Sequence, residues 1–181
     1  TAEDLTRRLE GAFRTLERLP RFKGHFYNWY DLHDLRVLEP AYVSTVDSGN
    51  LAGYLIAVRQ ACRAIAAALA GADGTDLASR LGSIAERAQA YALEMDFGFL
   101  FDRTRRLFAI GYQQASHSLD GSYYDLLASE ARLASYLAVA KKDVPVDHWF
   151  RLGRTLTSSA RDPALVSWSG RVFEYLMPLL L

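Results

Sequence analysis

The chain has 181 residues, of which 50% are hydrophobic and 23% are charged, a composition typical of one soluble globular domain. Its 21 basic and 21 acidic residues balance, and neither sign forms a long block, which argues against nucleic acid or an anionic membrane surface as a partner. No apolar run approaches the roughly 18 to 20 residues that span a bilayer, and residues 1–4 do not resemble the start of a signal peptide. We therefore expect a soluble chain.

The first predicted helix covers residues 2–19. Leu5, Leu9, Leu16 and Leu19 recur with Ala12 at spacings of four and three, which is typical of one helix face, and Pro20 ends the pattern. Residues 22–46 are rich in aromatics, contain Gly24 and Pro40, and have no helical period. They predict an extended loop with a short strand near 42–43, and a loop of this length is often functional.

Two helices of similar length follow. Asp47 or Ser48 can cap the first by accepting a backbone N–H, and its apolar stripe continues from Leu51 toward Gly71. After a turn at 73–74, Thr75 offers a second cap and the period continues to Met95. Because the connection is short, the two helices are expected to pack antiparallel.

The second half of the chain mixes strands and helices. Apolar residues flank a polar centre at 102–106, which predicts a small β-hairpin near 99–112. The leucine- and alanine-rich run 123–140 predicts a helix that ends at Lys141 and Lys142, followed by a shorter helix at 146–152. The last predicted helix begins at Ser167 or Ser169 and ends before Pro178.

Common catalytic and cofactor motifs are absent from the sequence. It contains no glycine-rich phosphate loop, no serine elbow and no cysteine cluster, and its single cysteine, Cys62, lies on an apolar helix stripe. The four histidines are scattered along the chain, and lone histidines are seldom metal ligands. We predict no metal and no cofactor.

Carboxylates among aromatic residues are the more informative feature, because aromatic faces stack on sugar rings while carboxylates bind hydroxyls and transfer protons. In the first such segment, 24–31, the candidates for sugar binding are His25, Trp29 and Asp31. The alternative is a loop whose aromatics fill the core. In the second, 45–50, Asp47 and Asn50 crowd a helix start, although capping alone also explains Asp47.

The third segment, 123–132, contains Tyr124, Asp125 and Glu130. If the segment is helical, Glu130 shares the inward stripe with Leu127 and must be paired or must line a cavity. An internal ion pair is the alternative, and Asp125 is explained by a first-turn position.

The fourth segment, 167–178, places Glu174 among aromatics that include Trp168. Its alternative is a capped helix with Glu174 paired to Arg171.

These stretches resemble the glucoamylase-like domain of bacterial cyclic β-1,2-glucan synthases, which are very large inner-membrane enzymes. The resemblance rests on residues 24–31, 42–53, 122–135, 148–154 and 168–180. It implies a mainly α fold, an (α/α)₆ toroid built of antiparallel helical hairpins. Twelve helices of about 12 residues with connections of about 6 need more than about 200 residues, so residues 1–181 are expected to form roughly half of one such domain.

The resemblance also implies a function. In such synthases this domain closes linear β-1,2-glucan into rings by transglycosylation, and retention of configuration needs two carboxylates about 5 to 5.5 Å apart. Glu130 is the first choice for one of them and Glu174 the reserve. A family motif, tryptophan-glycine-isoleucine-serine-glutamate, is absent, so we expect the isolated chain to be inactive.

The implied partners are a β-glucan oligosaccharide, the rest of the same domain and the other domains of a larger protein, with this domain on the cytoplasmic side of the inner membrane. One alternative is a non-catalytic helical glycan-binding or scaffold module, which the same aromatics permit. Another is a helical interaction unit that self-associates, because half a toroid exposes apolar surface.

Overall fold

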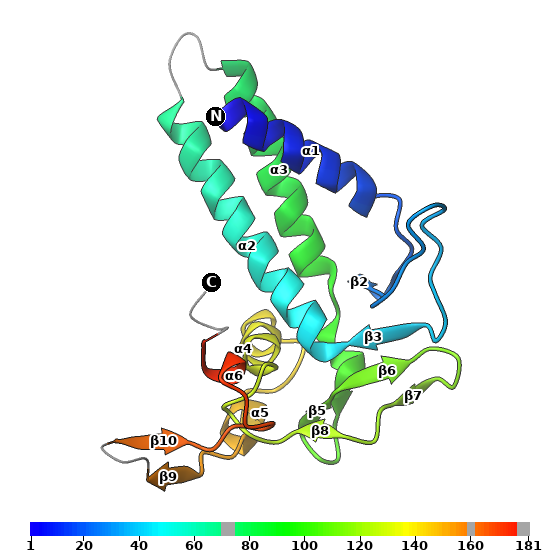
Figure 1. Cartoon of the computed structure of the whole chain (residues 1–181), viewed down its shortest axis with the longest axis vertical. Coiled ribbons are helices and arrows are strands. Elements are labelled where there is room, and N and C mark those ends of the chain that lie inside the picture. Colours follow the sequence, from blue (N-terminus) through cyan, green and yellow to red (C-terminus); the bar gives the residue numbers. More distant parts are fainter. Residues whose placement is uncertain (70–74, 159–161, 177–181) are drawn as a thin grey trace.

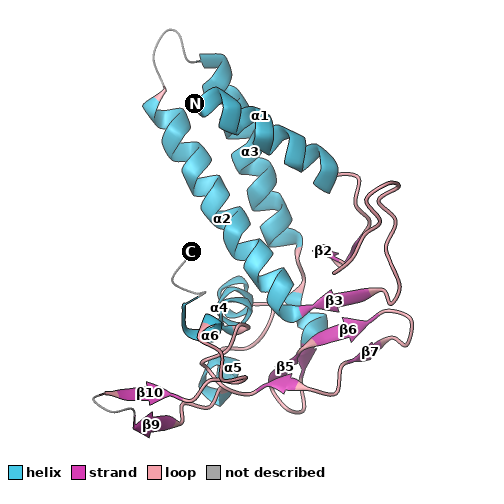
Figure 2. Ribbon diagram, in the orientation of Figure 1, coloured by secondary structure: helices cyan, strands magenta, loops and turns pink. Residues whose placement is uncertain are grey.

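The computed structural model describes residues 1–69, 75–158 and 162–176 (Figure 1). Three long helices lie together at one end of the molecule, and short helices and small sheets lie at the other (Figure 2). The helices are α1 (Ala2–Leu16), α2 (Thr45–Ala68), α3 (Thr75–Glu94), α4 (Arg132–Lys141), α5 (Asp147–Arg151) and α6 (Phe173–Leu176), with a 3₁₀ turn η1 (Phe97–Leu100).

Four small antiparallel sheets connect these helices. The two-stranded sheets pair β1 (Arg21–Phe22) with β2 (His25–Phe26), and β9 (Leu156–Ser158) with β10 (Pro163–Leu165). The three-stranded sheets have the order β3 (Tyr42–Ser44), β6 (Gly111–Gln113), β7 (Ser118–Leu119) and the order β4 (Phe101–Asp102), β5 (Leu107–Ala109), β8 (Tyr123–Tyr124).

About half of the chain is helical and the rest includes four small antiparallel sheets, so the prediction of a mainly α fold is confirmed only in part, while the toroid stays a prediction. The antiparallel pair α2 and α3, the strand near 42–43 and the hairpin β4–β5 are as expected, and Cys62 is buried. The turn at 73–74 lies outside the described residues. Thr75 is the first helical residue of α3.

Four boundaries differ from the expected ones, and the first is the end of α1, at Leu16 instead of Leu19. The prediction of a helix over 123–140 was wrong at its beginning, because Tyr123 and Tyr124 pair with β5 and the helix starts only at Arg132. The last helix starts at Phe173, and the hairpin of β9 and β10 was not predicted. Ser44 caps α2, accepting a hydrogen bond from Asp47 N at 3.1 Å, so the predicted caps Asp47 and Ser48 lie inside the first turn.

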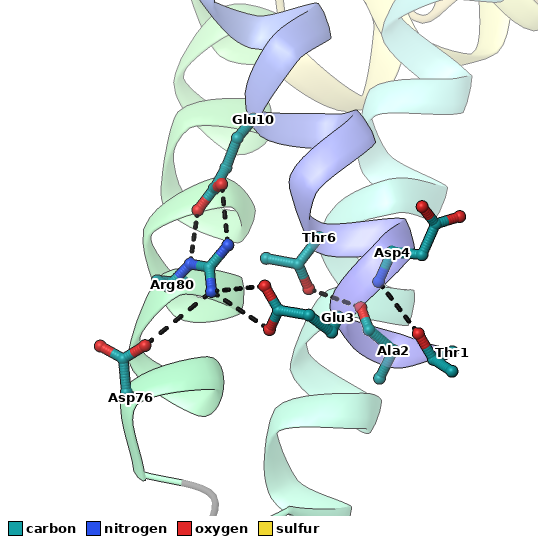
Figure 3. Close-up of polar contacts among 8 residues, drawn as sticks. All are labelled: Thr1, Ala2, Glu3, Asp4, Thr6, Glu10, Asp76 and Arg80. Atoms are coloured by element: carbon teal, nitrogen blue, oxygen red, sulfur yellow. Dashed lines mark hydrogen bonds and ion pairs between the residues drawn. The ribbon is translucent and has the colours of Figure 1, made fainter.

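Ion pairs hold α1 against α3 (Figure 3). The guanidinium of Arg80 donates two hydrogen bonds to Glu10, of 2.8 and 2.9 Å, and reaches Glu3 at 2.9 Å. Arg87 pairs with Glu17 at 2.5 Å. The apolar stripe predicted for this helix is confirmed in part, because Leu9 and Leu16 pack against the core. Leu5 is exposed instead, and Thr6 and Phe13 are buried. Charge therefore supplements a narrow apolar contact.

The main core lies between α2, α3, η1 and α4. It contains Leu55 and Cys62 of α2, Leu81 and Ile84 of α3, and the buried ring of Phe97. Helix α2 approaches α4 very closely, since a Cβ atom on Gly49 would lie only 2.5 to 2.8 Å from Ala134. Glycine at 49 therefore sets the distance between these two helices.

Helix α2 also passes a simple test for a membrane-crossing helix. It has 24 residues, and its most apolar 18-residue window has a mean hydropathy of 1.2 with 22% of the window buried. The expectation that no apolar run would approach this length was wrong by that measure. Core helices of soluble proteins pass the same test, so it carries little weight.

Candidate functional site

A cavity of about 420 Å³ opens between the loop that follows β2 and the N-terminal turns of α2. Its lining residues are Phe26, Tyr27, Asn28, Trp29, Asp47, Ser48 and Leu51. The first two aromatic and acidic segments of the sequence therefore meet at one place, as a shared role in ligand binding requires.

Asn28 fastens the loop to the start of α2. Its backbone N–H donates to Tyr42 O at 2.9 Å, and its side-chain oxygen accepts from Ser44 N at 3.1 Å. Its side-chain amide donates to Asp47 Oδ2 at 3.1 Å. The exposed Asp47 carboxylate is thus held at the cavity edge with an oxygen still available for another donor.

Trp29 supplies an aromatic face. It is 48% exposed and stacks on Tyr42 with ring centroids 6.3 Å apart and planes at 29°. Tyr42 donates to Asp120 Oδ2 at 3.4 Å. Burial and then the nearby charge of Asp120 raise the pKa of Tyr42 to about 12. A supported and partly open indole is the kind of surface that stacks on the C–H face of a sugar.

Tyr124 and Trp168 form a second aromatic pair beside the start of α2. Their ring centroids are 4.8 Å apart, and the indole N–H of Trp168 donates to Tyr123 O at 2.9 Å. Tyr124 is 9% exposed and packs with Val46 of α2 and with Ala131. This small apolar cluster joins the third and fourth segments to the second.

Glu130 lies in the turn before α4, so the argument from a helical stripe was wrong for it. Its side chain is nevertheless half-buried, and no described residue forms a hydrogen bond or ion pair with its carboxylate. Burial, and then the charge of Glu174, raise the pKa of Glu130 above its ordinary value, while Arg171 opposes the shift. This carboxyl group therefore binds a proton more readily than an ordinary glutamate does.

Glu174 has a different environment. It is 1% exposed, and it accepts hydrogen bonds from Ser169 N at 2.9 and 3.0 Å and from Arg171 N at 3.2 Å. Burial acts to raise the pKa of Glu174, but these backbone bonds outweigh it and lower the pKa overall. Its oxygens are occupied by the chain, which fits a positioning role better than contact with a sugar.

The two glutamates therefore differ in environment, and the pKa of Glu130 is raised while the pKa of Glu174 is lowered. Asp47 also acts on the pKa of Glu130, and Tyr124 has its pKa raised by burial first and then by Glu130. The acidic groups of the second, third and fourth segments thus lie within electrostatic reach of one another.

Four other candidates lie in places that suit ligand binding less well. His25 is fully buried and bonds Asp96 O at 2.9 Å, between the rings of Phe97 and Phe99. Asp31 accepts from His33 N within its own loop.

Asp125 is exposed and lies outside any helix, so the prediction that it occupies the first turn of a helix was wrong. Asn50 lies on the second turn of α2, and its buried Oδ1 has no hydrogen-bond partner among the described residues.

Sequence reasoning did not single out three residues of the site. Asn28 and Tyr42 organise the cavity, and the charge of Arg171 acts on Glu130. Asn28 alternates with aromatics in a segment that was noted, but nothing in the sequence distinguishes it from its neighbours. Arg171 was considered only as an ion-pair partner of Glu174, and it contacts that carboxylate through its backbone N–H instead.

Acid is expected to destabilise the fold through His25. Burial lowers the pKa of this ring from 6.5 to about 4; the bond to Asp96 opposes the shift and the charge of Lys141 adds to it. Since the unfolded chain binds the proton near pH 6.5, stability that is present at pH 7 is lost as the pH falls toward 4.

Urea unfolding should show that protonation of this ring makes the free energy of unfolding about 2 kcal/mol lower at pH 5 than at pH 7. Buried His148, whose pKa is also lowered by burial, adds a loss of the same sign. The exposed loop residue His33 provides the control, because His33→Gln should retain the whole loss while His25→Asn should remove its larger part. An equal loss of stability between pH 7 and pH 5 in both variants would contradict the assignment of this loss to His25.

The fold and site together define a partly helical module with a hollow lined by aromatic residues and one carboxylate, Asp47, a combination that can bind a sugar ring. No family model matches the chain. It is 33% identical over 291 residues to the cyclic beta-(1,2)-glucan synthase NdvB of Rhizobium meliloti (strain 1021), a match that covers 98% of this chain and 10% of that protein.

This similarity confirms the resemblance to cyclic β-1,2-glucan synthases: the chain is related to one segment of such an enzyme. The chain spans only about a tenth of the relative's length. The matched stretch of 291 residues is longer than the 181 residues of this chain, so the relative contains residues within it that have no counterpart here.

Proposed function

We propose that this chain is part of a glucan-processing module that transglycosylates linear β-1,2-glucan into rings, with Glu130 as the acid and base. The relative's printed activity supports the substrate class. The observation that carries the mechanism is the Glu130 carboxyl group, which is half-buried, unpaired among the described residues and raised in pKa beside an aromatic pair.

In this proposal the sugar stacks on Trp29 and lies along the start of α2. Asp47 binds its hydroxyls, and Glu130 donates a proton to the oxygen of the glycosidic bond that breaks, while a second carboxylate that these 181 residues do not supply takes the anomeric carbon. Glu130 then takes the proton from the glucan hydroxyl that displaces this carboxylate and closes the ring. Glu174 holds the turn at 169–171 in place, and its negative charge adds to the effect of burial in raising the pKa of Glu130. Tyr124 and Trp168 border the reacting sugar.

The competing function is glycan binding without chemistry, which the cavity and its aromatics support equally well. Incubation of the full-length gene product with linear β-1,2-glucan separates the two, because only the first yields cyclic or elongated glucan. Binding without product would support the competing function. Inactivity of the 181-residue chain alone stays a prediction, and the same assay tests it.

Trp29→Ala is expected to weaken binding of linear β-1,2-glucan oligosaccharides roughly ten-fold or more, because one aromatic stacking contact is lost. Isothermal titration of the 181-residue chain measures this change. The matched control is Trp149→Ala, which removes an indole that packs edge-to-face on Tyr136 instead of lining the cavity. Equal affinities of Trp29→Ala and the wild type would exclude the cavity as the sugar site.

Self-association is a further expectation. Tyr54 and Ile56 on α2 and Leu93 on α3 are 44%, 41% and 55% exposed, although α2 is apolar enough to be an interior helix. Light scattering over a concentration series should show a dimer whose population falls in Ile56→Glu. A species that remains monomeric at every concentration would contradict this expectation. Attachment of the larger protein to the inner membrane, with this part on the cytoplasmic side, stays a prediction.

A further inference from the structure

A second cavity, of about 280 Å³, lies between the β4–β5 turn and α5. Its lining residues are Arg106, Asp147, Phe150 and Arg151. None of them belongs to the proposed glucan site, and the proposed function gives them no role. Phe150 is 74% exposed, so its ring is open to a ligand in this cavity.

The side chains of the two arginines in this cavity have no ion-pair partner among the described residues. Neither Arg106 nor Arg151 forms an ion pair or a side-chain hydrogen bond with any residue in the described part of the chain. Arg105 and Arg154 nearby behave differently. Arg105 pairs with Asp102 at 3.7 Å and covers the ring of Tyr123, and Arg154 donates to the carbonyls of Leu152 and Trp149.

Hydrogen bonds hold the backbone of Arg106 in place. Its backbone has φ of 59°, in the left-handed region that arginine seldom adopts. Its N–H donates to Asp102 O at 2.7 Å, and its carbonyl accepts from His148 Nδ1 at 3.0 Å. Buried His148 is in turn bonded to Ser135 of α4 at 2.8 Å. The backbone beneath this guanidinium is therefore fixed before any ligand arrives.

The lining carries two guanidinium groups against the single carboxylate of Asp147, so its net charge is positive. A neighbouring cavity is lined by Arg103 and Lys142 and by one carboxylate, Asp143, so its charged residues also sum to a positive charge. Paired guanidinium groups match the geometry of phosphoryl oxygens, and an exposed phenyl ring stacks on a flat ring.

We propose that this cavity binds a phosphoryl group attached to a sugar or base ring. Arg106 and Arg151 hold the phosphoryl oxygens, and Phe150 stacks on the ring. A hexose phosphate and a nucleoside diphosphate share this chemistry.

Three probes titrated into the 181-residue chain by calorimetry test this assignment: inorganic phosphate, a hexose 1-phosphate and a nucleoside diphosphate. We expect saturable binding, with at least one ring-bearing probe about ten-fold tighter than inorganic phosphate. The tighter of the two ring-bearing probes identifies the source of the phosphoryl group. Absence of saturable binding for all three probes would overturn the proposal.

Variants separate the two parts of the site. Arg106→Gln and Arg151→Gln should each weaken the binding of every probe at least ten-fold. Phe150→Ala should abolish only the higher affinity of the ring-bearing probes over inorganic phosphate. The matched control is Arg63→Gln, which removes the same charge from an exposed position on α2 and should change nothing. Equal weakening in Arg63→Gln would mean that only overall charge matters, and the proposal would fail. If Arg106→Gln does not fold, Arg151→Gln on the exposed face of α5 still decides the question.

Discussion

Replacement of Glu130 by glutamine in the full-length gene product is expected to lower the rate of ring formation from linear β-1,2-glucan by roughly 10²- to 10⁴-fold. Glutamine keeps the size and hydrogen-bonding shape of the side chain but cannot donate or accept the proton that the reaction moves. Affinity for the glucan should change little, because the aromatic contacts remain. Single-turnover product analysis and a separate binding titration distinguish the two effects.

Glu86 of α3 provides the control for this change. It is exposed and forms no ion pair with any described residue, so Glu86→Gln removes one carboxylate and leaves the turn that carries Glu130 unchanged. Full activity of Glu130→Gln would remove this residue from the catalytic role.

The pH profile supplies an independent readout of the same carboxyl group. Because Arg171 opposes the rise in the pKa of Glu130, Arg171→Gln should move the basic limb of the profile to higher pH. The backbone N–H of residue 171 still caps Glu174 in this variant, so the turn should persist.

Long periodic segments were the most predictable part of this fold. Helices α2 and α3 were expected from apolar residues repeated over many turns, and the structure places both near the expected bounds. Residues 123–131 have a similar period, yet Tyr123 and Tyr124 complete a sheet with β5 and the chain then turns before α4. Pairing with a distant strand decided that conformation, and local sequence carries no signal for it.

The site was predictable at the level of segments but not of individual side chains. The loop at 24–31 and the start of α2 do meet in a cavity, as the aromatic and acidic residues suggested. Within that loop, however, Trp29 faces the cavity while His25 enters the core. The alternation of polar and aromatic residues does not reveal which ones point inward, because that depends on the path of the chain past Phe97 and Phe99.

Gly49→Val is expected to destabilise the folded chain by roughly 3 kcal/mol, the largest effect of any single apolar substitution considered. A Cβ at this position would lie 2.5 Å from Ala134 Cβ and 2.7 Å from its Cα. Backbone atoms of a packed helix cannot rotate away, so α4 must move outward and take the Glu130 turn with it. The variant should therefore also lose glucan binding or activity.

Gly82 provides the matched control, because it lies inside α3 and a Cβ there would meet nothing within 4 Å. Gly82→Ala should stabilise the chain by roughly 0.5 to 1 kcal/mol, through the better helix propensity of alanine alone. Urea unfolding should therefore show a lower free energy of unfolding for Gly49→Val and a higher one for Gly82→Ala. If Gly49→Val proves as stable as the wild type, α4 does not need the close approach, and the Glu130 turn must be held by other contacts, such as the packing of Ala131 on Tyr124 and Val46.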